Sequence, residues 1–481
     1  MKTKQIRGTH NPLSPWELMD HQEVEEIHQL TLRILSEIGV RVDDEEAREL
    51  LRQAGARVDE DHVAYIEESL VAKALQSVAK ETQMYDREGQ PAFVLKDDNQ
   101  VFGGGSDTIS TYDRQGRHVD VNLQTVRDFA RLQDALPNYD FVMGMGSGME
   151  VEDLFRDGVN FAAMLQNTTK PICFTAQSMG AMEDIVDMCL AVRGSKEALI
   201  EKPFTMLYAM PTAPLIHTAE ALRGLMLAAD YGIPCIYGAA PMKGATGPIS
   251  MKGSLAVGNA ETLSGLVIHQ LRRPGAPYVH AMTIGPLQMR TMVNIYNGPE
   301  SIEIQFAACQ MARYYGLPSF VTGGCSDSKM FDVQSASECA LSLYTAIAAG
   351  GSVVHDVGYL ESGLCSSPEQ CVLANELIDQ LRFLKEGYSK PSMEDLFAEI
   401  KEAGIGGNFL MADSTLDQHE QEIWYPDVFD HNNYGEWAAR CGISETEVIS
   451  RRATLLLEEH QPKPLSEELA KRLEQIARHQ L

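Results

Sequence analysis

The residues best suited to chemistry lie in one stretch of the chain, 320–363. It begins FVTGGCSDSKMFDVQSASE and ends SVVHDVGYLESG. A short apolar strand is expected to run into a glycine turn that carries Asp327 and Lys329, and after a helix a second strand ends at His355 and Asp356. Reactive groups that directly follow a strand are typical of parallel α/β proteins, whose active sites lie at the carboxyl ends of the strands. This stretch is therefore the first candidate for a functional site.

Lys329 allows three interpretations. It could form a Schiff base with a carbonyl group, bind an anion, or be a solvated residue at the start of a helix. Asp327 and Asp332 are close to it in sequence, and an opposite charge nearby stabilises a protonated amine. These carboxylates argue against a nucleophilic lysine, although the sequence leaves all three interpretations open.

His355 also allows more than one interpretation. A single histidine at the end of an apolar strand is often a hydrogen-bonded core residue, but Asp356 and Tyr359 beside it indicate a polar pocket. His280, His355 and Cys325 are residue types that bind zinc, yet their spacing matches no compact zinc motif. We therefore expect a polar pocket without a metal ion.

Four tyrosines suggest a ligand with a positive charge. Tyr208, Tyr237 and Tyr359 fall at the ends of expected strands, and Tyr112 lies shortly after the first strand. Aromatic faces around a cation contribute about 0.5 to 2 kcal/mol each, and quaternary ammonium ligands are recognised in this way. Buried tyrosine is also common in protein cores, so packing remains the alternative.

An alternation of strands and helices is expected to position these groups. The expected strands are residues 101–102, 141–145, 172–176, 204–208, 235–237, 278–281, 319–322 and 352–355. The expected helices are residues 125–136, 154–166, 181–192, 216–231, 259–271, 299–315, 335–349 and 368–384. Such an alternation predicts an α/β fold, a (β/α)8 TIM barrel. An open doubly wound sheet is the alternative, and eight units favour closure.

Two further regions flank the barrel, which we expect at residues 101–386. For residues 1–100 we expect a cap or a dimerisation layer, with helices at 23–38, 44–54 and 66–78 followed by a β-hairpin region. For residues 387–481 we expect a C-terminal helical extension. Its first part, to residue 437, folds over the mouth of the barrel or packs outside it, and its last part, from residue 445, packs at the periphery or contributes to an oligomer.

Composition excludes several classes of partner. The 68 acidic and 40 basic residues give a net charge of −28, which argues against nucleic acid as a partner and is compatible with a cationic ligand or with solubility alone. The N-terminus lacks the apolar segment of a signal peptide, and no run reaches the roughly 18 apolar residues of a membrane span. The 9 cysteines form no CxxC pair. We expect a cytoplasmic protein without disulfides and without a membrane partner.

Three motifs together resemble the trimethylamine:corrinoid methyltransferase superfamily. They are GGCSDSKMFDVQSASE, SVVHDVGYLESGLCSSPE and GGNFLMADSTLDQH, and the resemblance extends from about residue 103 to residue 429. Members of that superfamily are (β/α)8 barrels that transfer a methyl group from an amine to the cobalt of a separate corrinoid protein. The resemblance implies a corrinoid-binding protein as partner, with no corrinoid (cobalamin) bound tightly to this chain itself. We also expect a homo-oligomer.

One departure from the superfamily indicates the substrate class. The trimethylamine enzymes contain pyrrolysine, whereas this sequence contains only the standard residues, and Lys329 is expected at or near the pyrrolysine position. The chain therefore resembles the branch that demethylates quaternary amines such as glycine betaine, proline betaine, carnitine or γ-butyrobetaine. A quaternary nitrogen already carries a positive charge and leaves as a neutral tertiary amine, so this chemistry needs no covalent adduct.

The resemblance and the strand ends together predict three groups of site residues. The catalytic group is His355, Lys329 and Asp327. The substrate-binding group, in which the tyrosines cage the cation, is Tyr208, Tyr237, Tyr359, Tyr112, His280, Asp356 and Glu361. The corrinoid-facing group is Gly103, Gly104, Gly105, Gly323 and Gly324, because glycine lets a bulky cofactor approach the backbone.

Two other functions remain possible from the sequence. A lyase or aldolase would use Lys329 to form a Schiff base with its substrate. A noncatalytic betaine-binding scaffold would share the tyrosine cage but would show no turnover.

Overall fold

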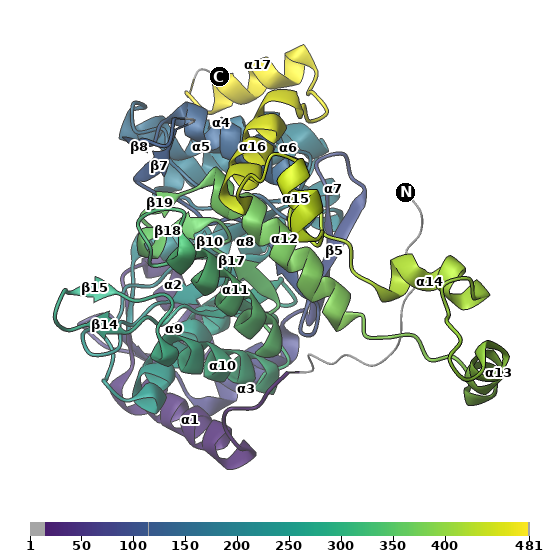
Figure 1. Cartoon of the computed structure of the whole chain (residues 1–481). Coiled ribbons are helices and arrows are strands. Elements are labelled where there is room, and N and C mark those ends of the chain that lie inside the picture. The colour runs from purple at the N-terminus through teal and green to yellow at the C-terminus, as the bar shows by residue number, and fades with distance from the viewer. Residues whose placement is uncertain (1–14, 114, 480–481) are drawn as a thin grey trace.

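A seven-stranded parallel sheet forms the centre of the computed structural model, which describes residues 15–113 and 115–479 (Figure 1). Its strands are β6 (Val101–Phe102), β9 (Ile172–Phe174), β10 (Thr205–Ala209), β12 (Cys235–Ala239), β13 (Tyr278–Met282), β16 (Ser319–Thr322) and β17 (Val353–His355). The order is β6-β17-β16-β13-β12-β10-β9, and every neighbouring pair is parallel. Seven of the expected strands are therefore confirmed, and they belong to one sheet.

The strand expected to begin at Phe141 is not formed. Phe141 and Val142 make only isolated parallel bridges, to Gly103 after β6 and to Ile172 at the start of β9. Met145 has a φ of 51°, in the left-handed region, so the chain does not stay extended there. This segment contacts both edge strands without forming a ladder. A closed (β/α)8 barrel therefore remains a prediction.

Helices cover the sheet, and most begin at a side chain that caps their free backbone N–H groups. The helices from the first of these strands onward are α4 (Leu123–Ala135), α5 (Asp153–Asn167), α6 (Met179–Arg193), α7 (Lys196–Glu201), α8 (Ala219–Tyr231), α9 (Met251–Arg272), α10 (Pro299–Tyr314), α11 (Val333–Ala348) and α12 (Pro368–Lys385). Asp332, for example, accepts a hydrogen bond from the backbone N–H of Ser335 in α11. The helix expected from residue 216 begins later, because Ile216–His217 form strand β11.

Residues 15–80 form a layer of helices and short strands. Its elements are α1 (His21–Arg33), a π-helix (Ile34–Ile38), β1 (Val40–Val42), α2 (Glu45–Gln53), β2 (Arg57–Val58), β3 (Val63–Tyr65) and α3 (Glu68–Ser77). β1 pairs with β11 in parallel, so main-chain hydrogen bonds join this layer to the body. The expected end of the first helix is confirmed at Gly39, whose φ of 82° favours glycine.

A β-hairpin of β4 (Glu81–Tyr85) and β5 (Pro91–Lys96) covers the amino end of the sheet. Met84 and Leu95 of this hairpin belong to one buried apolar cluster with Phe320 and other side chains of the main sheet. That end of the interior is therefore packed with apolar groups. Only the carboxyl ends of the strands remain available for a site.

Short elements follow several of the strands at the carboxyl end. They are β7 (Ser110–Tyr112), β8 (His118–Asp120), β14 (Leu287–Gln288), β15 (Val293–Asn294), β18 (Tyr359–Leu360), a 3-10 turn (Glu361–Gly363) and β19 (Cys365–Ser366). β18, β19, β7 and β8 form one small sheet, while β14 and β15 form a separate hairpin.

The C-terminal residues are partly packed and partly projecting. α16 (Glu445–Glu459) packs on α12 and α4, and α17 (Glu467–Ile476) packs on α5 and α6. Before them, α13 (Met393–Ala403) and α14 (Asp413–Glu422) project away from the body, and α15 (Tyr434–Ala439) lies near its edge (Figure 1).

No helix within the described residues is long and apolar enough to cross a membrane. Every cysteine is unpaired, and all except Cys441 are buried. They occupy core positions, as small apolar side chains do.

Candidate active site

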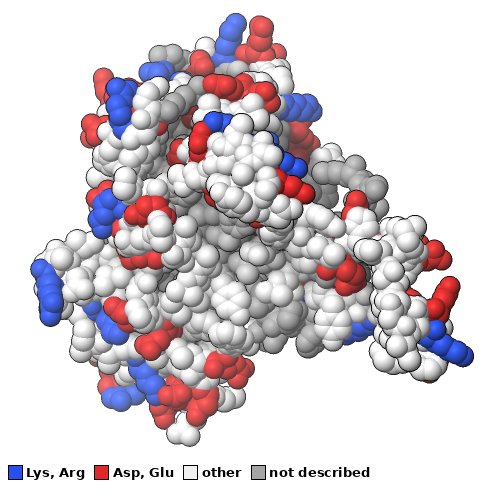
Figure 2. Space-filling model, in the orientation of Figure 1, with Lys and Arg blue, Asp and Glu red and all other residues white. Residues whose placement is uncertain are grey.

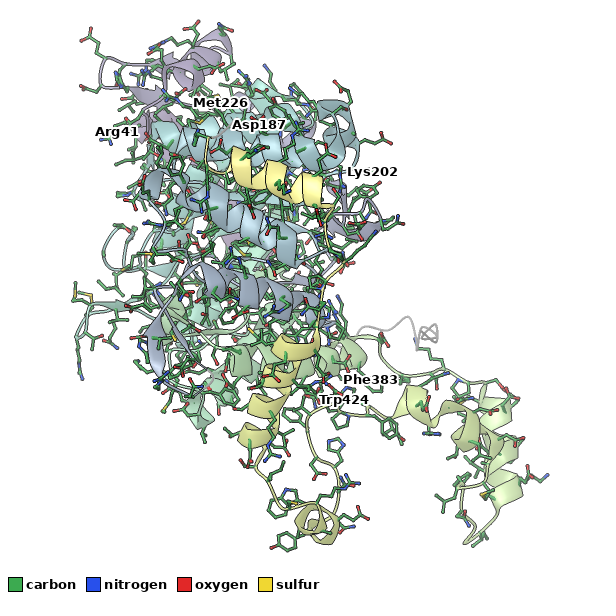
Figure 3. The ribbon with its side chains drawn as sticks, turned by 90° about the horizontal axis from the view of Figure 1, so that it is seen from above. Arg41, Asp187, Lys202, Met226, Phe383 and Trp424 are labelled. Carbon is green, nitrogen blue, oxygen red and sulfur yellow. The ribbon has the colours of Figure 1, made fainter. Side chains whose placement is uncertain are left out.

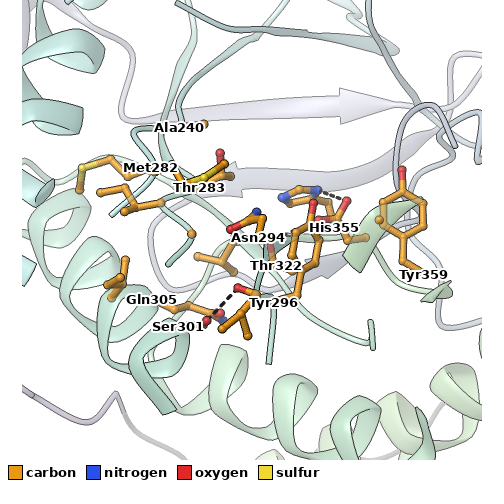
Figure 4. Close-up of a pocket in the computed structure, with 18 of the residues that line it drawn as sticks. Ala240, Met282, Thr283, Asn294, Tyr296, Ser301, Gln305, Thr322, His355 and Tyr359 are labelled. Carbon is orange, nitrogen blue, oxygen red and sulfur yellow. Dashed lines mark hydrogen bonds and ion pairs between the residues drawn. The ribbon is translucent and has the colours of Figure 1, made fainter. Parts of the chain in front are cut away.

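A cavity of about 350 Å³ opens at the carboxyl ends of the strands (Figure 4). Tyr208 of β10, Thr322 of β16 and His355 of β17 reach it from the sheet, Tyr296 from the loop after β15, and Gln305 from α10. Other wall residues include Ser106, Asp107, Met210, Met242, Met282, Thr283, Asn294, Asp356 and Tyr359. The strand ends therefore meet at one site, as parallel topology requires.

His355 is held from two sides. Its ring stacks on Phe320 of the neighbouring strand, with centroids 3.7 Å apart and planes 7° apart. Its Nδ1 lies 2.7 Å from Oδ1 of Asp356, while Oδ2 of that carboxylate accepts a hydrogen bond from Thr322 Oγ1 at 3.3 Å. Neither ring nitrogen of His355 makes an aligned hydrogen bond among the described residues: Nδ1 has only the close contact with Asp356, and the buried Nε2 has no partner. An oriented ring nitrogen without a partner is available to bind a ligand.

Three tyrosines form an aromatic wall. Tyr208, Tyr296 and Tyr359 all line the cavity, and the Tyr208 ring lies 6.0 Å from the His355 ring. Burial raises the pKa of Tyr296 and of Tyr359 well above the usual value, so both phenols stay neutral. Neutral aromatic faces attract cations through the ring quadrupole.

The carboxyl groups of the wall face no lysine or arginine among its described residues. Asp107 and Asp356 line the cavity, and none of the described lining residues is Lys or Arg. Asp107 keeps contact with solvent at the mouth, yet desolvation by the protein around it, together with the nearby Asp157, raises the pKa of Asp107 to about 6. Thr175 Oγ1 donates a hydrogen bond to Asp107 at 3.4 Å. A carboxylate that is costly to ionise is stabilised strongly by a bound cation.

Two amide groups in the wall also lack partners. Asn294 Oδ1 and Gln305 Nε2 are buried without a hydrogen-bond partner in the described part of the chain. Asn294 is packed against Gly285, where an added Cβ would lie 1.9 Å from its Oδ1. Buried polar atoms without partners are rare and costly, so their presence around a cavity indicates a polar ligand.

The structure does not bring Lys329 and Asp327 to the cavity, although both were expected to be catalytic. Lys329 is exposed, and its Nζ donates to the main-chain carbonyl of Asp327 at 2.9 Å. The Asp327 carboxylate accepts hydrogen bonds from the backbone N–H groups of Tyr296 and Asn297, at 3.0 and 2.9 Å, and from the Ser362 hydroxyl at 2.7 Å. Asp327 therefore fixes the loop that carries Tyr296. Neither position supports a catalytic role.

Tyr237 and His280 face away from the cavity. They are register partners on β12 and β13, so their side chains share one side of the sheet. Tyr237 OH hydrogen-bonds with His217 Nδ1 at 2.8 Å, and His280 Nε2 with Asn259 Oδ1 at 2.9 Å. Burial lowers the pKa of His280 to about 3. Both residues belong to the layer between sheet and helices and lie outside the cavity wall, so a role in substrate binding stays a prediction without support from their placement.

Tyr112 and Glu361 also lie outside the cavity wall. Tyr112 OH donates to the main-chain carbonyl of Lys329 at 2.6 Å, and the backbone N–H of Glu361 donates to the carbonyl of Ser328 at 2.8 Å. Both contacts hold the loop that follows β16, so these residues support the site from behind.

The glycines expected to face a corrinoid are all buried: Gly103, Gly104, Gly105, Gly323 and Gly324. An added Cβ at Gly103 would lie 2.3 Å from the Phe141 ring, and one at Gly105 would lie 1.9 Å from the Tyr359 ring. Close packing by itself requires glycine at these two positions. The role of the five residues toward a corrinoid stays a prediction.

The sequence does not predict three residues of the cavity wall: Asn294, Tyr296 and Gln305. Asn294 ends the short strand β15, Tyr296 lies on the loop after it and Gln305 lies on α10, so none of them directly follows a strand of the main sheet, and they belong to no motif. Asp107 can be found from the sequence, because it follows β6 and ends a GG-x-SD run like the one that ends at Asp327.

Known proteins match nearly the whole chain. The family described as trimethylamine methyltransferase (MTTB) matches residues 1–480. The glycine betaine methyltransferase of Desulfitobacterium hafniense strain Y51 is 31% identical over 431 residues, which cover 89% of each chain. The trimethylamine methyltransferase of Methanosarcina thermophila is 31% identical over 490 residues, which cover 98% of this chain and 99% of that one.

A crystal structure of the monomethylamine methyltransferase of Methanosarcina barkeri is a more distant likeness. It is 11% identical and aligns with a TM-score of 0.49 over 91% of this chain and 92% of that chain. The sequence matches carry the assignment: the protein belongs to the trimethylamine methyltransferase family and is a methyltransferase.

Proposed function

We propose that the protein removes a methyl group from a quaternary amine of the betaine type and transfers it to the Co(I) of a corrinoid held by a partner protein. The observation that carries this proposal is the wall of the cavity, which combines three tyrosine faces with two carboxyl groups and contains no Lys or Arg among its described residues. Such a wall favours a permanently charged ammonium group. The similarity to a glycine betaine methyltransferase supports the betaine class.

This methyl transfer requires the protein to position the substrate and does not require an acid or a base. The N–CH3 bond breaks with its electron pair remaining on nitrogen, so the amine departs as a neutral tertiary amine without a proton. The corrinoid supplies the nucleophile when it is bound. The residues of this chain bind the ammonium group, orient one methyl group toward the mouth and exclude water.

The two ends of a betaine match two kinds of group in the wall. The faces of Tyr208, Tyr296 and Tyr359, with the Asp107 carboxylate, suit the ammonium end. The carboxylate end needs hydrogen-bond donors, and the amide Nε2 of Gln305 is one of them. The ring Nε2 of His355 donates as well when the imidazole carries both protons, because Nδ1 faces the Asp356 carboxylate. No lysine is required for this binding.

The mouth of the cavity fits a partner with an apolar surface. Exposed apolar side chains lie on the loops that follow four neighbouring strands, with exposed fractions between 41% and 68%: Met210, Ile249, Met289, Met292 and Met330. Methionine is flexible and polarizable, so it adapts to a partner surface. These residues support docking of a corrinoid protein over the mouth.

We further propose that the sheet closes as a (β/α)8 barrel around the site. The support is the pair of bridges through which Phe141 and Val142 contact both edge regions of the sheet. Closure would exclude water from the interior below the cavity.

A spectroscopic assay tests the proposed activity. The protein is mixed with a reduced corrinoid protein, and the absorbance of Co(I) is followed after glycine betaine, proline betaine, carnitine or trimethylamine is added. We expect at least one quaternary amine to consume Co(I) with formation of the tertiary amine, and trimethylamine to be inactive. Co(I) that survives every quaternary amine, or that reacts equally well with trimethylamine, would overturn the proposal.

The Schiff-base alternative receives no support, because Lys329 Nζ is exposed and hydrogen-bonded to a main-chain carbonyl outside the cavity. Borohydride added with substrate should therefore leave the mass of the protein unchanged. A noncatalytic scaffold would bind betaines in calorimetry but would leave Co(I) intact in the same assay.

A further inference from the structure

Residues 388–423, which we term the arm, project from the body as a separate pair of helices, α13 and α14 (Figures 1 and 3). Both ends of the arm are fixed to the same helix. One end continues from α12, and beyond the other end Trp424 Nε1 donates to Asp379 of α12 at 2.9 Å. The two ends of the arm are therefore anchored on α12, while the helices between them project from the body.

The arm presents apolar side chains that its own chain does not bury. No residue of α13 or α14 is buried in the described structure. Met393, Phe397 and Ile400 recur at helical spacing along one side of α13, with exposed fractions of 70%, 67% and 58%. Six more large apolar residues of the arm are exposed: Ile405, Phe409, Leu410, Met411, Leu416 and Ile423. The space-filling view shows the arm as largely uncharged on this face (Figure 2).

Helices of this length need a partner. α13 has 11 residues and α14 has 10, and isolated helices shorter than about 12 to 15 residues are marginal in water. Nine exposed apolar side chains at on the order of 100 Å² each amount to roughly 900 Å², close to the roughly 800 Å² that one partner buries in a standard interface. The arm thus carries enough apolar surface for a stable protein contact.

We propose that this contact is with a second copy of the same chain, in a two-fold dimer in which each arm lies against the other subunit. An apolar surface of this size must be covered permanently, and a second copy is always present, whereas a methyl-accepting carrier has to leave after each transfer. The position of the arm agrees with this choice. It extends to the right in Figure 1, and the β14–β15 hairpin next to the cavity lies at the left, so the arm does not cover the mouth.

The charge of the chain predicts how such a dimer responds to salt. Each chain carries −28, so two copies repel one another and apolar burial has to outweigh this repulsion. Salt screens this repulsion over about 10 Å at 0.1 M. The dimer should therefore become tighter as salt rises, whereas an arm docked on a basic partner would be released.

Sedimentation of the full chain tests the proposal. We expect a species of twice the 53.1 kDa of one chain, which is favoured at 0.5 M over 0.05 M salt. The double variant Phe397→Glu and Ile400→Glu should weaken dimerisation at least tenfold. The single variant Phe397→Glu should also weaken dimerisation, whereas Ala398→Glu, which adds the same single charge at an exposed position away from the apolar side of α13, should leave the dimer intact. Methyl transfer should stay unchanged in all of these variants, because the arm contributes nothing to the cavity.

Hydrogen exchange of the unmodified protein provides a measurement that does not depend on a variant. Amides of α13 and α14 should be protected at high protein concentration and lose this protection on dilution. A monomeric wild-type chain with unprotected arm amides would overturn the proposal. So would a double variant that remains a dimer, including one that instead loses binding of the corrinoid protein, because the arm would then serve the carrier.

Discussion

The ring of His355 lies face to face with the ring of Phe320, at a centroid distance of 3.7 Å. The two residues come from neighbouring strands of the sheet, and the contact of His355 Nδ1 with Asp356 fixes the remaining rotation of the imidazole. Asp356 has a φ of 66°, in the left-handed region, a costly conformation that is most often kept at functional sites. Nε2 of His355 is thereby oriented before a substrate arrives.

We expect His355→Ala to lower kcat/KM for glycine betaine by about 10- to 100-fold, because a hydrogen bond to a charged group contributes about 1.5 to 3 kcal/mol. Tetramethylammonium offers a matched control, since it has the methylated nitrogen but no carboxylate. Its turnover should change by less than about threefold if His355 binds the carboxylate end. An equal loss with both substrates would assign His355 to the ammonium end instead.

Tyr359→Ala should weaken binding of the quaternary amine, because one face of the aromatic wall is lost. The expected loss is about 0.5 to 2 kcal/mol, or about 2- to 30-fold in Kd measured by calorimetry. Tyr359→Phe keeps the ring and removes only a hydroxyl that is buried without a hydrogen-bond partner in the described chain, so its Kd should stay near that of the wild type. A Phe variant as weak as the Ala variant would contradict the role of the ring face.

Binding of the cation should depend on pH through Asp107. The pKa of this carboxyl is about 6 in the free protein because of desolvation and the Asp157 charge. A bound cation stabilises the ionised form, so binding expels a proton when Asp107 starts protonated. Affinity should therefore rise with pH through about 6 and be lost progressively below it. Asp107→Asn should bind more weakly at pH 8 and show a flatter profile. A wild-type affinity that is constant from pH 5 to 8 would exclude Asp107 from cation binding.

Lys329 and Asp327 should differ in their effects although they are close in sequence. Lys329→Ala removes an exposed side chain, so stability should change by less than about 0.5 kcal/mol and methyl transfer by less than about twofold. Asp327→Ala leaves the donors of Tyr296, Asn297 and Ser362 without their acceptor, which should cost about 1 to 3 kcal/mol. Denaturant unfolding and the Co(I) assay measure both quantities. Loss of methyl transfer in a stably folded Lys329→Ala variant would show that this lysine is needed for catalysis.

The sequence by itself determined the order of the elements and several of the cavity residues. Apolar strands separated by amphipathic helices recur along the chain, and this local pattern predicts a parallel sheet without knowledge of long-range contacts. His355, Asp356 and Tyr208 could be placed at the cavity because they stand at or just after a strand, where the carboxyl ends of parallel strands converge.

Only the tertiary structure decided which strand-end residues face the cavity. Tyr237 looks equivalent to Tyr208 in sequence, but neighbouring side chains on a strand alternate between faces, and Tyr237 lies on the face that packs against α9. Gln305 reaches the wall from a helix, and Tyr296 depends on hydrogen bonds from its loop to Asp327. Side-chain direction and contacts between distant segments depend on register and packing of the whole fold, which no local pattern of residues contains.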